Sequence, residues 1–202
     1  MRSLKTVLLI IALSIMAPLA FTGVSQGDET NVRWDIISID FVAGTVSAGG
    51  NASAKANEFP TPSKITVTGS GTFETSAGSD DVTGGGSWQT FDPAGNPTAS
   101  GTYTVTRLVR FDVAPGTFPP QFTDNIGNAA DARAGLAVLS IRYSDGSRGI
   151  LVVSCHFNGT PDSVFEGITA SKGFVDYWNR VAPAPGVNAN RTAFHVVKGD
   201  DD

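Results

Sequence analysis

The stretch from residue 136 to residue 157, LAVLSIRYSDGSRGILVVSCHF, constrains the fold of this chain more than any other. Two runs rich in β-branched and apolar residues, 136–143 and 150–157, flank the pair Asp145 and Gly146. An Asp-Gly pair between two such runs predicts a β-hairpin with a tight turn. A two-residue loop at this pair would place Ile141 opposite Ile150.

A three-residue loop with a left-handed Gly146 instead brings the odd-numbered side chains of both strands to one face. That register collects the most apolar set, which is Ala137, Leu139, Ile141, Tyr143, Leu151, Val153, Cys155 and Phe157. The opposite face is still half apolar, so we expect both strands to be inner strands, covered on both sides.

The rest of the chain also favours strands and turns over helices. Glycine is abundant, with 23 residues, and charged residues make up only 16%. Alternating or β-rich runs recur at hairpin spacing, and no amphipathic segment is long enough for a helical crossover. Glycines inside strands, at Gly69, Gly71 and Gly167, indicate bends or the close approach of another backbone. We predict an all-β fold, a single antiparallel β-barrel or a strongly curved β-sandwich of about 8–10 strands.

The N-terminus has the three parts of a secretory signal peptide, namely a positive start, an apolar middle and a small-residue cleavage site. We therefore predict a signal peptide over residues 1–25, a single β-domain over 26–198 and an acidic tail over 199–202. The mature protein would be secreted, either extracellular or periplasmic, with no membrane span after cleavage. An uncleaved N-terminal anchor is the alternative.

Charge and cysteine content exclude several function classes. Without Arg2 and Lys5, 12 basic residues face 19 acidic ones, a formal charge of −7. An acidic chain without basic clusters is unsuited to nucleic acids and to anionic membrane surfaces. Cys155 is the only cysteine, so no intramolecular disulfide can form and stability must come from the core.

Candidates for chemistry are few. Cys155 and His156 are adjacent, but neighbours in a strand point to opposite faces, so we expect Cys155 to be a core residue. The weak catalytic candidates are Arg107, Glu166, Lys172, His156 and His195. Arg107 interrupts an apolar face predicted for residues 101–113, which suggests an internal cavity or, alternatively, an ion pair at the rim of the sheet.

Aromatic side chains that can stack on sugars or other flat ligands provide a second set of candidates. The weak ligand-binding candidates are Trp34, Trp88, Tyr103, Tyr177 and Trp178, and the alternative for each is a place in the core. We predict no cofactor and no metal, because the one cysteine and two histidines lack zinc spacing. The oxygen-rich segments 79–81 and 124–131 do not match an EF-hand loop.

One short motif resembles known barrel proteins. The sequence Gly69-Ser70-Gly71-Thr72-Phe73 is similar to the Gly-x-Gly-x-Phe turn of the allene oxide cyclase and dirigent barrels. The similarity covers these five residues only, and no catalytic residue of those families can be matched in this chain.

Three functional hypotheses are consistent with these observations. The leading one is a secreted, non-enzymatic β-domain that binds a small molecule, a glycan or a surface. The second is a small metal-independent barrel enzyme of the lyase, isomerase or cyclase kind, with Glu166, Lys172 or Arg107 in an internal polar cavity. The third is a structural component of an envelope or matrix.

Overall fold

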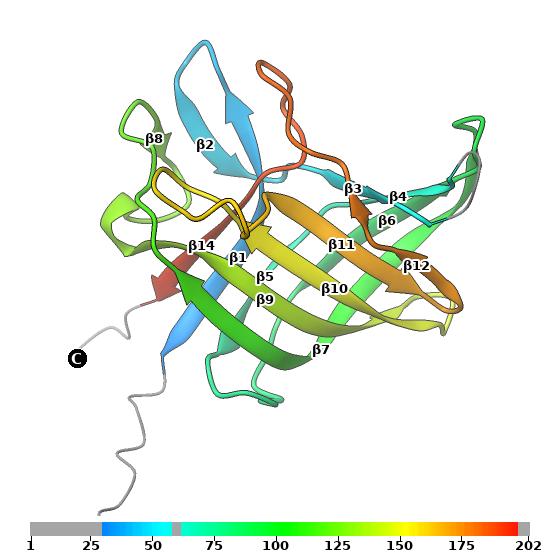
Figure 1. Cartoon of the computed structure of the whole chain (residues 1–202). Helices are drawn as coiled ribbons and strands as arrows, with labels where there is room; N and C mark the ends of the chain where they lie inside the picture. The colour runs from blue at the N-terminus through cyan, green and yellow to red at the C-terminus, as the bar shows by residue number, and fades with distance from the viewer. Residues whose placement is uncertain (1–29, 58–61, 198–202) are drawn as a thin grey trace, which may run out of the picture.

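The chain folds into one continuous, highly curved sheet that is antiparallel except for the short pairing of residues 45–46 with 123–124 (Figure 1). The computed structural model describes residues 30–57 and 62–197, so the predicted signal peptide and acidic tail lie outside the described residues. Regular structure in the described part consists of strands and one 3-10 turn, η1 (Ala129–Asp131), without any α-helix. The strands are β1 (Asn31–Asp40), β2 (Thr45–Ala48), β3 (Ala52–Lys55), β4 (Lys64–Val67), β5 (Ser70–Glu74), β6 (Gly85–Phe91), β7 (Pro97–Ala114), β8 (Thr123–Asp124), β9 (Ala132–Tyr143), β10 (Arg148–Cys155), β11 (Gly167–Lys172), β12 (Val175–Tyr177), β13 (Asn179–Arg180) and β14 (Thr192–Val197).

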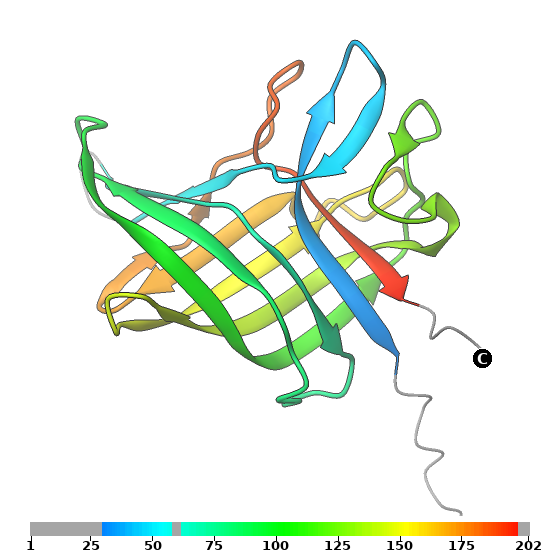
Figure 2. The ribbon, with the colours of Figure 1, turned by 180° about the vertical axis from the view of Figure 1, so that it is seen from behind.

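Six of these strands close into a barrel, which confirms the predicted all-β fold. Strands β1, β5, β6, β7, β9 and β14 pair in a ring, and each pairing is antiparallel (Figure 2). The longest pairing joins β7 to β9, from Tyr103 opposite Tyr143 to Ala114 opposite Ala134. Closure leaves no open sheet edge in this ring.

Six further strands extend the sheet beyond the ring on both sides. Strands β10, β11 and β12 continue from β9, while β4, β3 and β13 continue from β6. The chain passes from β12 through Trp178 directly into β13, so Tyr177 pairs with Ala170 and Asn179 pairs with Lys55. This short segment links the two outer edges of the sheet.

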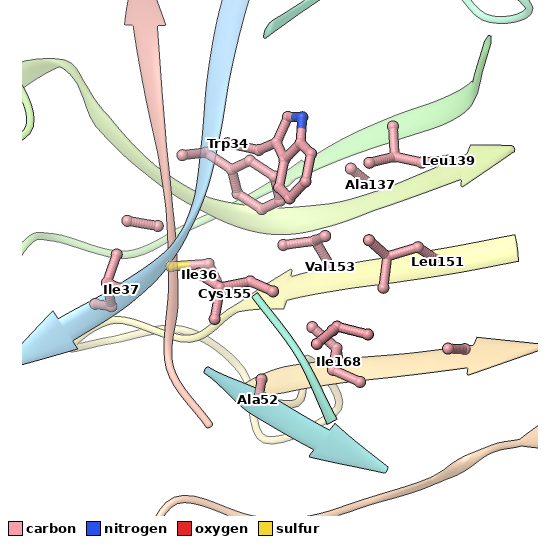
Figure 3. Close-up of a cluster of buried hydrophobic side chains, with 14 of the residues drawn as sticks. Trp34, Ile36, Ile37, Ala52, Ala137, Leu139, Leu151, Val153, Cys155 and Ile168 are labelled. Atoms are coloured by element: carbon pink, nitrogen blue, oxygen red, sulfur yellow. The ribbon is translucent and has the colours of Figure 1, made fainter. Parts of the chain in front are cut away.

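The central hairpin has the predicted register. Leu139 lies opposite Leu151 and Ala137 opposite Val153, across a three-residue loop in which Gly146 has a φ of 87°. Their side chains point into the core beside Trp34 and Cys155 (Figure 3). The core also contains a cluster of three aromatic side chains, Phe73, Phe111 and Phe194, whose rings contact one another. Maximising the buried apolar face therefore predicts the register correctly.

Strand β7 departs from the simple alternation predicted for residues 101–113. Its register against β9 shifts between Val105 and Arg107 and again between Leu108 and Arg110. Each irregularity changes which side chains face inward, so Leu108 is fully buried while Arg107 points outward. The alternation predicted for residues 101–113 is wrong for this reason, and Arg107 forms an exposed ion pair with Asp80, as in the second of the two alternatives.

The glycines inside β5 and just before it allow a close approach, as predicted. A Cβ atom at Gly71 would lie 2.2 Å from the backbone oxygen of Thr83 and 2.8 Å from Nε1 of Trp34. At Gly69, a Cβ atom would lie 2.3 Å from the Tyr103 hydroxyl. Only glycine fits where the Trp34 ring and the neighbouring chain are this close.

Several connections are long and irregular, and they gather around one end of the barrel (Figure 1). The segment 115–131 contains only β8 and η1. Residues 156–166 and 181–191 also lack strands. Among the described residues there is no helix long and apolar enough to cross a membrane.

The buried position of Cys155 gives a direct test of the core. Its side chain is inaccessible, and burial raises the pKa of the thiol well above its usual value. We expect a maleimide to leave Cys155 unmodified in the native protein and to react with it after unfolding in urea. Replacing Cys155 by Ala or Val should cost up to about 2 kcal/mol of unfolding free energy and leave any binding activity intact. Rapid labelling of the native protein would contradict this placement.

Candidate functional site

The structure separates the ionisable candidates instead of bringing them together. Arg107 is 53% exposed at its side chain and pairs with Asp80 at 2.8 Å on the outside of the barrel. Lys172 lies beside the 144–147 turn, where its Nζ pairs with Asp145 and sits 4.3 Å from the centre of the Trp88 ring. Neither contacts Glu166, which lies near the opposite end of β10.

An apolar pocket lies at that opposite end, in the mouth of the barrel. Its volume is about 240 Å³, and it is lined by β1, β2, the first residue of β14 and the three irregular connections 115–131, 156–166 and 181–191. Its lining residues are Ile37, Ile39, Val46, Phe118, Pro119, Phe122, His156, Phe157, Glu166, Pro183, Arg191 and Thr192. Most of these side chains are apolar, and the ionisable ones are Glu166, His156 and Arg191.

The carboxyl group of Glu166 connects three parts of the chain. Its Oε2 atom accepts a hydrogen bond from the His156 backbone N–H at 2.5 Å, and Oε1 accepts one from the Thr192 N–H at 2.6 Å. Burial raises the pKa of Glu166 to about 8, because it outweighs the two N–H donors and the positive charge of Arg191. Glu166 is thus a largely neutral carboxylic acid at pH 7.

The imidazole of His156 is held in one tautomer. Its Nδ1 atom lies 2.7 Å from the carbonyl oxygen of Val164, and a carbonyl only accepts hydrogen bonds, so Nδ1 carries a proton. In the neutral ring Nε2 is then an acceptor, and no hydrogen-bond partner for it exists among the described residues. His156 therefore brings an available acceptor to the pocket.

Arg191 supplies the positive charge, and sequence reasoning did not identify it. Its guanidinium donates to the carbonyl oxygens of Val187, Ala189 and Ala184 and lies 5.3 Å from the centre of the Phe41 ring. These three bonds leave two of its five N–H donors without a partner in the described part of the chain. Nothing in the sequence near Arg191 indicates that the loop folds back onto it.

His195 lies outside the pocket and anchors one of its walls. Its Nε2 donates to Asp124 Oδ2 at 2.7 Å, and both side chains are almost completely buried. Asp124 also accepts from the backbone N–H of Ile126. This contact holds the 115–131 segment against β14. The same segment supplies Phe118 and Phe122 to the lining of the pocket.

The aromatic candidates are mostly core residues. Trp34, Trp88, Tyr103 and Tyr177 are buried, whereas Trp178 is 63% exposed beside a shallow groove on the outer face of β10 and β11. Among the described residues, no cluster of three or more His, Cys, Asp or Glu side chains is placed to hold a metal ion.

The raised pKa of Glu166 predicts a specific pH dependence of stability. The native state holds a proton on this group up to about pH 8, while the unfolded chain releases it near pH 4.5. The contribution of Glu166 is therefore fully present below pH 4.5 and is lost as pH rises to 8, at most by roughly 1.4 kcal/mol per pH unit.

Urea unfolding at several pH values, compared with Glu166→Gln, isolates this contribution. We expect the wild-type protein to lose stability relative to the variant between pH 5 and pH 8. The amide itself should cost about 1–3 kcal/mol at every pH, because its NH2 group faces a backbone donor. A difference between the two proteins that does not change with pH would refute the assignment.

Comparison with known proteins adds no family assignment. Models of protein families, curated proteins and solved structures give no match to this chain. The resemblance of residues 69–73 to known barrels thus remains limited to those five residues.

Proposed function

We propose that this protein binds a small, mainly apolar ligand with one polar group in the mouth pocket. The single observation that carries the proposal is the pocket itself, an apolar hollow of about 240 Å³ in which Glu166, His156 and Arg191 are the ionisable lining residues. Binding sites for small molecules are typically concave and apolar, with a few polar groups that fix orientation.

The size of the pocket limits the ligand. Its volume equals that of roughly eight water molecules at about 30 Å³ each. A short acyl chain or a single ring system fits inside this space and a second ring can extend through its opening, whereas an oligosaccharide does not fit. Displacing water from apolar walls such as Ile37, Ile39 and Phe122 contributes about 25 cal/mol per Å² of apolar surface removed from water.

The sequence supports a role outside the cell or in the periplasm. The signal-like N-terminus and the acidic mature chain without basic clusters suit a secreted carrier or scavenger of small molecules better than a nucleic-acid binder. The filled barrel interior also supports placing the ligand at the mouth, since Trp34, Phe73 and Phe194 occupy the centre.

Binding of N-phenyl-1-naphthylamine, a neutral fluorophore that brightens in apolar surroundings, tests this proposal. We expect saturable fluorescence enhancement with one site per chain. Ile39→Trp should fill the pocket and reduce the affinity at least about tenfold, while Ile150→Trp on the outer face of β10 is a matched control without effect. Equal binding by both folded variants, or no binding by the wild type, would rule out the mouth pocket.

A second candidate is an acid-base enzyme, favoured by one observation. Glu166 is a carboxylic acid with a pKa of about 8, and it lies in the same pocket as the available Nε2 of His156. A proton donor and a proton acceptor in one apolar pocket are the requirements for an isomerase or lyase that moves a proton next to a carbonyl group.

Proton exchange separates the two candidates. A ketone such as 2-octanone exchanges its α-protons for deuterium in heavy water and so loses their NMR signals. If the pocket catalysed proton transfer, this loss would be faster with the protein than in protein-free buffer made with heavy water. The binding proposal predicts the buffer rate for both the wild type and Glu166→Gln. Acceleration that disappears in Glu166→Gln would establish the enzyme instead.

A further inference from the structure

We infer that the polar group recognised in the mouth pocket is a carboxylate, so that the ligand class is a small monocarboxylic acid with an apolar tail. This inference rests on the proposed function and specifies the ligand of the same site. It follows from which charges and hydrogen-bonding groups the pocket presents and from which of them are already used within the protein.

The first step concerns the charge of Arg191. Its guanidinium has no salt-bridge partner, because no carboxylate among the described residues lies within ion-pair distance of it. It is tied to backbone carbonyls of the 184–189 loop, which fix its position without neutralising it. A fixed cation beside an apolar pocket favours an anionic partner, and arginine suits the planar carboxylate in particular.

Among the described residues that line the pocket, Glu166 is the only acidic one. It remains protonated at neutral pH, so it does not cancel the charge of Arg191. Its two oxygens accept from the N–H groups of His156 and Thr192, and the acidic proton is available to a further acceptor. A protonated carboxyl group in an apolar site is a strong hydrogen-bond donor toward an oxyanion.

The third step concerns His156, whose Nε2 atom is free to exchange a proton with a ligand. A carboxylate that binds together with one proton taken from water can share that proton with Nε2, so that an N–H group faces a ligand oxygen and the proton count stays balanced. An amine head group would instead place a second cation near Arg191. An alcohol would use the acceptor but leave the positive charge unpaired.

The other titratable groups around Glu166 do not change the net charge of the pocket. Cys155 lies at the end of β10 with its thiol neutral, and Arg191 precedes β14. His156 approaches from the segment after β10, and its backbone already donates to Glu166. At neutral pH the pocket therefore carries the positive charge of Arg191, which a bound carboxylate neutralises.

Competition by three molecules with the same tail tests the inference. Octanoic acid, 1-octanol and octylamine are titrated against bound N-phenyl-1-naphthylamine at pH 7. We expect octanoate to displace the fluorophore at least about tenfold more effectively than octanol, and octylamine to be the weakest. Equal displacement by octanoate and octanol, or a preference for octylamine, would overturn the inference and leave the binding proposal intact. If the fluorophore does not bind at all, the proposed function fails and the inference fails with it.

The pH dependence of octanoate binding, relative to octanol binding, gives a second test that uses the folded wild-type protein. Above about pH 8, Glu166 ionises, and its negative charge offsets the charge of Arg191 at a distance and repels the ligand carboxylate. The advantage of octanoate over octanol should fall by up to about tenfold per pH unit there, and Glu166→Gln should make it independent of pH. A wild-type advantage that stays constant from pH 7 to pH 9.5 would contradict the role of Glu166.

Arginine variants locate the charge. Arg191→Met should remove the preference for octanoate, while Arg107→Met, which loses an exposed arginine far from the pocket, should preserve it. Arg191 also supports the 184–189 loop, so octanol binding is measured in parallel to report whether the pocket persists. If the pocket collapses in Arg191→Met, the competition series and the pH profile of the wild type decide the question.

Discussion

The carboxyl group of Glu166 determines how the mouth of this barrel is built. It holds the chain just after β10, through the N–H of His156, against the first residue of β14, through the N–H of Thr192. These residues are far apart in sequence, and no strand pairing joins them at this point. Because the same carboxyl group lies in apolar surroundings, connecting the two strands also creates a protonated acid at the pocket.

The division between core and site follows from the closure of the barrel. A ring of six strands is narrow enough for side chains to fill, and Trp34, Phe73, Phe111 and Phe194 do so. A ligand site therefore has to form where strands end and long connections cover the opening. The buried Asp124–His195 contact fixes one of these connections, and the bonds of Arg191 to backbone carbonyls fix another.

Sequence reasoning predicts the core of this protein well and its site only in part. The hairpin register and the burial of Cys155 follow from side-chain alternation and the three-residue turn, which are local properties. The alternation predicted around Arg107 fails because two irregularities in β7 change which side chains face inward, and no residue pattern marks them. Glu166 and His156 are found as candidates, but their contact depends on how the segment after β10 folds back on itself, and the sequence does not indicate this. Arg191 is missed because its role arises from a loop conformation.

The most direct test of this account is the titration of the Glu166 carboxyl group itself. Carbon-13 NMR of the protein labelled at glutamate carboxyl carbons, with the Glu166 signal assigned from Glu166→Gln, reports its ionisation without reference to any ligand. The account predicts a midpoint near pH 8 in the free protein. A midpoint near 4.5, the ordinary value for glutamate, would mean that the carboxylate already neutralises Arg191, and the proposed recognition of a carboxylate ligand would be contradicted.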